Sequence, residues 1–193
     1  AMAALAGLCA LAQTDIKKSL AYSTLAHLGI MGAALGLGHP ELALLHMAMH
    51  ACFKATLFLG AGSVIHGCHH EQDMLRMGGL ARRMPVTFAA FLVATLSNCA
   101  VPFLAGWYSK DAILEAAHEH GAAVFALLAV AALATCLYSG RMIRLVFLGA
   151  PRGEDAAHAH ESPWTMLLPL VVLGLGYSVV AGTHLGLPAA SAA

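Results

Sequence analysis

The stretch LALLHMAMHACFKATLFLGAGSVI, Leu42 to Ile65, decides the fold of this chain. It is a continuous apolar run, and about 20 apolar residues are enough for a helix to cross the hydrocarbon core of a bilayer. Within it, His46, His50 and Lys54 stand four residues apart, with no acidic residue among them. The run therefore predicts a membrane-spanning helix that carries three ionisable groups.

The composition of the whole chain also indicates a membrane protein. Of its 193 residues, 60% are hydrophobic and only 10% are charged, whereas a soluble domain carries about 25% charged residues. The formal net charge is zero, which provides no basic surface for nucleic acid. The five cysteines are scattered and form no CxxC pair, so neither a disulfide framework nor a zinc ribbon is indicated.

Further apolar runs predict an all-α fold, a polytopic bundle of transmembrane helices with about five spans. Full spans are expected at Ser19–Gly38, Leu42–Ile65, Val86–Ala105, Gly121–Leu148 and Trp164–Leu185, and a partial span at Ala1–Gln13. Helices satisfy their own backbone hydrogen bonds in lipid, and these runs are too continuous for the alternating strands of a barrel. We expect one membrane domain over residues 1–193, which the partial first span predicts to be a fragment of a longer chain.

The basic residues fall on alternate connections between the predicted spans. The first, third and fifth connections share one side. They carry eight basic residues when Arg141 and Arg144, at the end of the predicted span Gly121–Leu148, are counted with the fifth connection: Lys17, Lys18, Arg76, Arg82, Arg83, Arg141, Arg144 and Arg152. The second and fourth connections carry only Lys110. Because cytoplasmic connections are rich in Lys and Arg, the odd connections are expected to face the cytoplasm, or the matrix in an organelle.

On a helix, His46, His50 and Lys54 form one slanting stripe, since residues four apart are neighbours on one face. A lysine at the centre of a bilayer costs roughly 2.5–3.5 kcal/mol on insertion scales, so this face should turn toward other helices or water. Histidine exchanges protons near neutral pH, and burial disfavours the charged form of an amine. The stripe is therefore a candidate proton relay.

Three other interpretations of the stripe stay open. Lys54 could snorkel to the membrane surface while the two histidines only pack between helices. The spacing of His46 and His50 suits zinc, but the Met-Ala-Met between them supplies no Glu, and we predict no metal site. A haem could be held by axial histidines on facing helices, His27 with His46 or His50.

A second feature with chemical content is the stretch CAVPFLAGWYSKDAILEAA, Cys99 to Ala117. Pro102 removes a backbone hydrogen bond and Gly106 permits bending, so a break in the helix is expected here, with Lys110 directly after it. Broken membrane helices that carry a charge recur at the ion sites of transporters. A surface loop that follows a span is the alternative.

Four motifs give the chain a resemblance to a known family. TDIKKSLAYSTLAHLGIM, HMAMHACFKATLFLGAGSVIHG, HHEQDMLRMGGL and GWYSKDAIL resemble, in this order, the antiporter-like subunits of proton-pumping NADH:quinone oxidoreductase, respiratory complex I. The resemblance covers Leu11 to Leu185, and HEQDMLRMGGL favours subunit L over the sister subunits M and N. The multisubunit sodium/proton antiporters share parts of the pattern and remain an alternative.

The resemblance implies roles for the ionisable residues. Lys17 matches the central lysine of the buried polar axis, which lies deeper than the cytoplasmic edge where hydropathy places it. His46, His50 and Lys54 match the residues that link this axis onward, and Lys110 matches the lysine at the broken helix, near the exit to the periplasmic side.

The resemblance also implies an architecture. In this family two inverted five-helix repeats each contain one broken helix, and the chain resembles the second repeat with flanking helices. Met84–His120 would then be one interrupted crossing with a non-helical middle at Pro102–Ser109.

The function implied is proton translocation by a subunit of NADH:quinone oxidoreductase, with no catalytic residue or redox centre in this chain. NADH, FMN, iron–sulfur clusters and quinone would belong to other subunits, since the sequence has neither a Gly-rich phosphate motif nor a cluster-binding Cys pattern. The expected partners are the other membrane subunits, especially antiporter-like subunit M, and the lipid of a bacterial plasma membrane or an inner mitochondrial membrane. A cation (Na+)/proton antiporter subunit without redox coupling is the alternative, and a haem-binding membrane anchor is a third.

Overall fold

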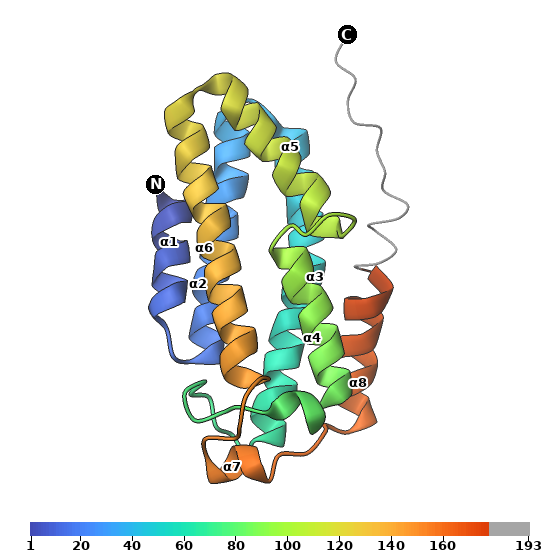
Figure 1. Cartoon of the computed structure of the whole chain (residues 1–193). Coiled ribbons are helices and arrows are strands. Elements are labelled where there is room, and N and C mark those ends of the chain that lie inside the picture. Colours follow the sequence, from blue (N-terminus) through green and yellow to red (C-terminus); the bar gives the residue numbers. More distant parts are fainter. Residues whose placement is uncertain (178–193) are drawn as a thin grey trace.

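The computed structural model describes residues 1–177, and its helices run up and down as an elongated bundle (Figure 1). The helices are α1 (Met2–Ala12), α2 (Ile16–Gly36), α3 (Pro40–Gly67), α4 (Pro85–Asn98), α5 (Ala105–His120), α6 (Ala122–Val146), α7 (Glu154–Ala157) and α8 (Trp164–Val171). A 3-10 turn, η1 (Leu80–Arg82), and a π-helical turn, η2 (Val172–Tyr177), complete the described elements. The described part of the chain contains no strand, which confirms the predicted all-α fold.

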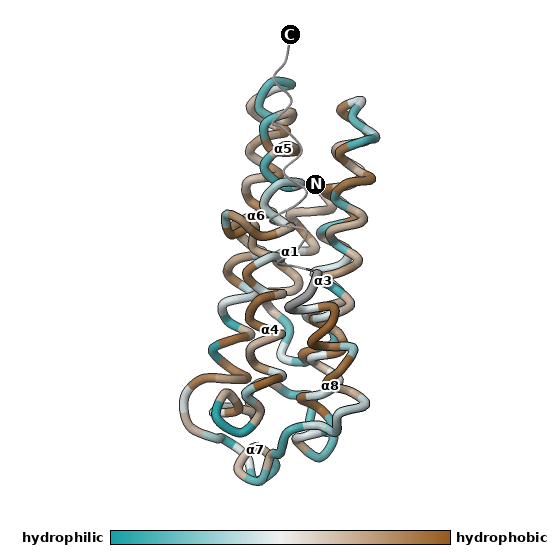
Figure 2. Tube along the Cα trace, turned by 90° about the vertical axis from the view of Figure 1, so that its right-hand side faces the viewer, coloured by the Kyte–Doolittle hydropathy of each residue, from teal (hydrophilic) through white to brown (hydrophobic). Residues whose placement is uncertain are grey.

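Two of these helices, α3 with 28 residues and α6 with 25, are long and apolar enough to cross a membrane. The helices α1 and α4 and the segment Trp164–Gly174 are apolar but shorter. Figure 2 shows hydrophilic residues gathered in the connections around α7 and again along α5 near the opposite end, with many apolar residues along the helices between them. The predicted span Trp164–Leu185 extends past residue 177, so its last part lies outside the described residues.

Local sequence signals explain where several helices begin. The side chain of Asp15 accepts hydrogen bonds from the backbone N–H groups of Lys17 and Lys18, at 2.8 and 3.1 Å, and so caps α2. Pro40 and Pro85 occupy the first positions of α3 and α4, where the missing N–H of a proline costs nothing.

The first, third and fifth connections lie at the same end of the bundle (Figure 1). The backbone N–H of Ile16 donates to the carbonyl of Gln72 at 3.1 Å, and that of Ala81 donates to the carbonyl of Phe147 at 3.0 Å. The guanidinium of Arg152 donates to carbonyl oxygens of the third connection at 2.9 Å. The structure thus joins the three basic connections on one side, as the alternation of charge predicts.

The region expected to form the single span Val86–Ala105 is broken instead. Helix α4 ends at Asn98 after 14 residues, and α5 begins only at Ala105. The predicted non-helical middle, Pro102–Ser109, is therefore wrong in its bounds, because the irregular segment is 99–104 and Gly106 to Ser109 already belong to α5. A chain of 14 helical residues is too short to cross the hydrocarbon core alone.

The irregular segment is built from unusual backbone conformations around the predicted Pro102. Ala100 and Phe103 have φ angles of 59° and 70°, in the left-handed region that residues other than glycine seldom adopt. Such conformations persist only where the surrounding structure enforces them, and they gather at functional sites. The break is therefore a defined part of the fold.

Gly106 allows α5 to start against the end of α4. Its backbone N–H donates to the hydroxyl of Ser97 at 3.1 Å, and a Cβ at this position would overlap the Ser97 carbonyl oxygen. Only a glycine permits so close an approach between the two half-helices. The sequence assignment of Gly106 to the break thus finds its reason in packing.

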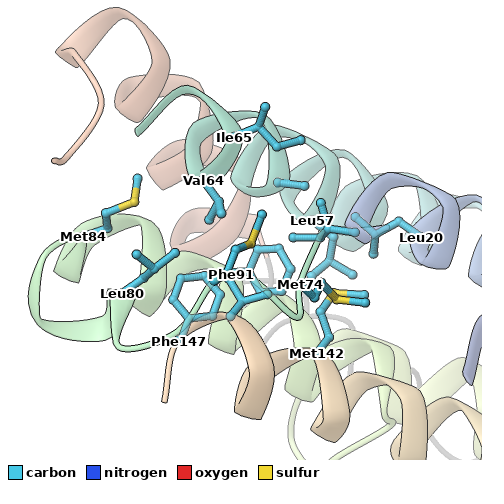
Figure 3. Close-up of a cluster of buried hydrophobic side chains, with 14 of the residues drawn as sticks. Leu20, Leu57, Val64, Ile65, Met74, Leu80, Met84, Phe91, Met142 and Phe147 are labelled. Carbon is cyan, nitrogen blue, oxygen red and sulfur yellow. The ribbon is translucent and has the colours of Figure 1, made fainter. Parts of the chain in front are cut away.

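A cluster of buried apolar side chains fills the bundle between the middle of α3 and the third connection. Figure 3 shows it, with residues from α2, α3, α4, α6 and the connection: Leu20, Leu57, Val64, Ile65, Met74, Leu80, Met84, Phe91, Met142 and Phe147. In lipid, such contacts stabilise a bundle by close packing rather than by removal from water. The cluster closes the bundle on the side of Lys54 that faces the odd connections.

Candidate functional site

Two lysines lie inside the bundle. Lys54 on α3 is 4% exposed and Lys110 on α5 is 3% exposed. Among the residues that the structure describes, the buried polar and charged side chains include no Asp or Glu. Buried amines without a carboxylate are costly in a membrane and point to a function rather than to structural pairing.

Lys54 is the first member of a hydrogen-bonded chain across three helices. Its ammonium donates to the hydroxyl of Ser23 on α2, and that hydroxyl shares a hydrogen bond with the phenol of Tyr138 on α6. Ser23 is fully buried and Tyr138 is 1% exposed. The polar groups are therefore held together by packing on all sides, which fixes their geometry.

Asn98 continues this chain to the second lysine. Its amide nitrogen donates to the Tyr138 hydroxyl at 3.5 Å and to the Ser139 hydroxyl at 3.1 Å. Its backbone carbonyl accepts a hydrogen bond from Lys110 Nζ at 2.7 Å. Ser23, Tyr138 and Asn98 thus link the two buried lysines.

The helix break explains why that carbonyl is available. In a continuing helix the carbonyl of Asn98 would accept from the N–H four residues later. The residue there is Pro102, which has no N–H. The broken helix therefore presents a free carbonyl oxygen inside the bundle, and Lys110 binds it.

Three histidine rings form a second polar chain beside the first. His27 Nδ1 lies 3.0 Å from His46 Nε2, and His46 Nδ1 lies 2.8 Å from the hydroxyl of Ser109, the neighbour of Lys110. The His27 and His50 ring centroids are 5.1 Å apart. His27 and His46 are fully buried, so each can only donate or accept protons within this group.

Three buried polar atoms in this region have no hydrogen-bond partner within the described part of the protein. They are Nε2 of His27, Nε2 of His50 and Oδ1 of Asn98. Buried polar atoms of this kind are the usual binding sites of internal water. Water at these atoms would join the histidine chain to the lysine chain.

The structure brings together four of the five predicted relay residues, His46, His50, Lys54 and Lys110, but not Lys17. Lys17 is exposed in the first turn of α2, at the end of the bundle that carries the odd connections. Lys17 is at the helix end because Asp15 caps α2 there. Its relay role and its depth in the membrane, as implied by the family resemblance, stay predictions.

Sequence reasoning left out partners that the structure supplies. On α2, Ser19, Ser23 and His27 stand four residues apart and are all buried. This spacing repeats that of the stripe on α3 and was the signal available in the sequence. Tyr138 had no such signal, because the residues four positions before and after it, Ala134 and Met142, are apolar.

The packing of His27 against His46 does not fit a haem held between these two rings. The rings of His27 and His46 stack at 13° with centroids 5.2 Å apart, which leaves no room for a porphyrin between them. Among the residues described, no group of three or more His, Cys, Asp or Glu side chains is arranged to hold a metal ion.

The sequence of the chain is similar to a known family and to known proteins. Residues 1–136 match the family described as NADH:quinone oxidoreductase/Mrp antiporter, TM. The chain is 48% identical over 186 residues to NADH-quinone oxidoreductase subunit L of Rhodobacter capsulatus. The aligned region covers 89% of this chain and 26% of that protein. The chain is 46% identical over 174 residues to NADH-ubiquinone oxidoreductase chain 5 of Cryphonectria parasitica, with 87% and 26% covered. The chain thus spans about a quarter of the length of these curated relatives.

Two solved structures share the fold. One is the membrane-bound sulfane sulfur reductase, an archaeal respiratory membrane complex, with a TM-score of 0.86 and 30% identity over 94% of this chain and 30% of that one. The other is the Mrp complex from a Dietzia species, with a TM-score of 0.83 and 18% identity over 94% of this chain and 42% of that one. At 18% identity, the second likeness concerns the fold alone.

Proposed function

Because this chain belongs to the NADH:quinone oxidoreductase/Mrp antiporter membrane family, we propose that it moves protons across a membrane as part of a NADH:quinone oxidoreductase. The observation that carries the proposal is the buried connection from Lys54 through Ser23, Tyr138 and Asn98 to Lys110. The redox chemistry and its NADH, FMN, iron–sulfur clusters and quinone belong to other subunits on this proposal. The chain itself supplies only groups that bind and release protons.

The two polar chains give a proton two routes between the lysines. In the first, the hydroxyls of Ser23 and Tyr138 pass a proton by donating on one side and accepting on the other. In the second, the neutral imidazole of His46 donates from one ring nitrogen and accepts at the other, between His27 and Ser109. Water at Nε2 of His27 and of His50 would extend this route to His50. The first route reaches Lys110 only through water at Asn98 Oδ1, because the Asn98 amide nitrogen only donates and its backbone carbonyl only accepts. The second route ends at Ser109, next to Lys110 in the sequence.

Among the residues described, no buried carboxylate neutralises Lys54 or Lys110. The charges of the two lysines therefore act directly on each other. Two ammonium groups in one buried cluster repel each other, so that protonation of Lys54 favours release of a proton from Lys110. A charge that changes in a neighbouring subunit would act on Lys54 in the same way. Direction is then set by the order in which the two lysines are charged.

The surroundings follow from the same proposal. The neighbouring partner is an antiporter-like subunit M, within a bacterial plasma membrane or an inner mitochondrial membrane. The odd connections face the cytoplasm or matrix, because they carry the basic residues. Lys110 then lies on the half of the bundle that leads to the opposite side, beyond the apolar cluster around Leu57 and Phe91.

A second candidate is cation/proton antiport without redox coupling. The family description, which includes the Mrp antiporter, favours this possibility. The two functions separate in membrane vesicles, since antiport persists without NADH and redox-driven pumping does not.

The proposal is tested in the intact enzyme by Lys54→Ala. Loss of this amine should slow proton transfer about 100-fold or more, the usual contribution of a positioned acid or base. Protons moved per NADH oxidised should therefore fall while the complex still assembles. Lys18→Ala is the matched control, because Lys18 is exposed at the helix end and has no predicted part in the relay, and it should leave the ratio unchanged. An unchanged ratio in the assembled Lys54→Ala enzyme would refute the relay.

A further inference from the structure

Two cysteines meet at the helix break, beside the proposed relay but outside it. Cys99 directly follows α4, and Cys136 lies in the middle of α6. The Cys136 thiol is 3.8 Å from the carbonyl oxygen of Cys99, and the Cys99 thiol is 4.0 Å from the carbonyl oxygen of Thr135. The chain folds so that residues 37 apart in sequence form a dithiol pair.

The pair is reachable from the outside of the bundle. Cys136 is exposed, and its neighbours Leu133 and Leu137 on the same helix are exposed as well. An apolar exposed face on a membrane-spanning helix is suited to contact with lipid. A reactant for this pair is therefore one that dissolves in the hydrocarbon phase.

The other side of the pair touches the relay. Cys99 follows Asn98, whose carbonyl binds Lys110, and Cys136 precedes Tyr138 by two residues. A bond between the two sulfurs would thus join the two elements between which the proton passes.

We propose that Cys99 and Cys136 form an oxidation site, at which a lipid hydroperoxide converts the two thiols into a disulfide that ties the helix break to α6 and stops proton transfer at Lys110. One thiol sulfur attacks the peroxide O–O bond, the alcohol leaves, and a sulfenic acid remains. The second thiol displaces water from that sulfur, and the S–S bond forms. In total the thiols lose two electrons and two protons, and the hydroperoxide is reduced to an alcohol and water.

The block follows from the position of Cys99. Forming the bond draws Cys99 toward α6, and the carbonyl of Asn98, one residue earlier, moves with it. Lys110 then loses the acceptor that holds it, and the amide of Asn98 shifts relative to Tyr138. This functional part rests on the proposed function, whereas the formation of the disulfide does not.

The experiment uses the intact enzyme in native membrane vesicles treated with cumene hydroperoxide. Free thiols are then blocked with N-ethylmaleimide, and digested peptides are analysed by mass spectrometry. A linked peptide that contains Cys99 and Cys136 is expected, and dithiothreitol should remove it. Protons moved per NADH should fall on treatment and recover with dithiothreitol.

Two variants serve as controls, Cys136→Ser and Cys99→Ser, so that a folding defect in one does not decide the result. Each should give no linked peptide and should keep its proton ratio under hydroperoxide. Oxidation of the exposed Cys9 without a linked peptide would overturn the site, because the oxidant then reached the chain. A linked peptide with an unchanged proton ratio would overturn the block, in a preparation where Lys54→Ala lowers the ratio. If Lys54→Ala also has no effect, the proposed function and the block fail together, and the linked peptide alone decides the site.

Discussion

At the scale of single residues, the broken helix matters because it changes what one carbonyl oxygen can bind. Pro102 lacks the N–H that would pair with Asn98, and Lys110 takes its place at 2.7 Å. A hydrogen bond to a charged group is worth more than a neutral one, about 1.5–3 kcal/mol. Pro102 thus both interrupts the helix and leaves a carbonyl oxygen free to hold the amine of Lys110 inside the bundle.

Tyr138 tests whether the hydroxyl chain conducts protons. Tyr138→Phe keeps the ring but removes the group that joins Ser23 to Asn98. Leaving these buried partners without their bond should cost about 1–3 kcal/mol of stability, and protons moved per NADH should fall. Tyr22→Phe is the control, since Tyr22 is 37% exposed on α2. Equal proton ratios in the two variants would assign transfer to the histidine route.

Cys68, in the third connection, offers a pH-dependent test of burial. Burial, and then the charges of Asp155 and Glu71, raise the pKa of the Cys68 thiol to about 11. The thiol therefore stays protonated at neutral pH, and maleimide should label it far more slowly than the exposed Cys9 between pH 7 and 9 (on the order of 100-fold near pH 8). Because the folded protein favours the protonated thiol, the free energy of unfolding should fall as the pH rises above 9.0, the ordinary pKa of a cysteine, toward the raised pKa of about 11. Equal labelling rates would show that the connection opens freely.

Sequence analysis could find the residues whose charge is energetically unfavourable within a single apolar helix. Lys54 and its two histidines break an apolar run, so their charge and spacing are visible without a structure. Ser23, Tyr138 and Asn98 are ordinary residues in isolation. Their role depends on which helices become neighbours, and that information lies in tertiary packing.

At the scale of elements, α2 and α3 place two polar stripes against each other. Ser19, Ser23 and His27 face the interior from one helix, and His46 and Lys54 face it from the other. Each stripe rests on a four-residue spacing, so one face of each helix is polar for several turns. The existence of the helix break could also be predicted, but its bounds could not, since they depend on left-handed residues and on the packing of Gly106.

The packing at Gly106 can be tested with a matched pair of glycines. Gly106→Ala should push α5 away from Ser97, because the new Cβ would overlap the Ser97 carbonyl. Overpacking of this kind costs about 1–3 kcal/mol, and the midpoint of thermal unfolding of the assembled enzyme should fall. Gly140→Ala on α6 meets nothing within 4 Å and should leave the midpoint unchanged or slightly raised. Similar midpoints for both variants would mean that the two half-helices are not in close contact.

At the scale of the whole molecule, the connections that carry the basic residues also lie together in the fold. The basic connections are joined to each other by backbone hydrogen bonds and by Arg152 at one end of the bundle (Figure 1). The apolar cluster of Figure 3 separates this end from the buried lysines. Hydropathy and the charge count were sufficient to predict the order of the helices and the shared side of the odd connections. They did not show that Val86–Ala105 is too short for a single span, because α4 ends at Asn98. The last part of the predicted span Trp164–Leu185 lies outside the described residues.

The orientation in the membrane can be measured with single cysteines in the full protein. Gln72→Cys lies in the third connection and His120→Cys at the end of α5, and both positions are exposed. The parent chain corrects for the exposed Cys9 and Cys136. A membrane-impermeant maleimide should label position 72 only from the cytoplasmic or matrix side and position 120 only from the other side, because the basic residues gather at the first end. Labelling of both from one side would contradict the bundle, whereas exchanged sides would keep the bundle and reverse the direction in which Lys110 releases its proton.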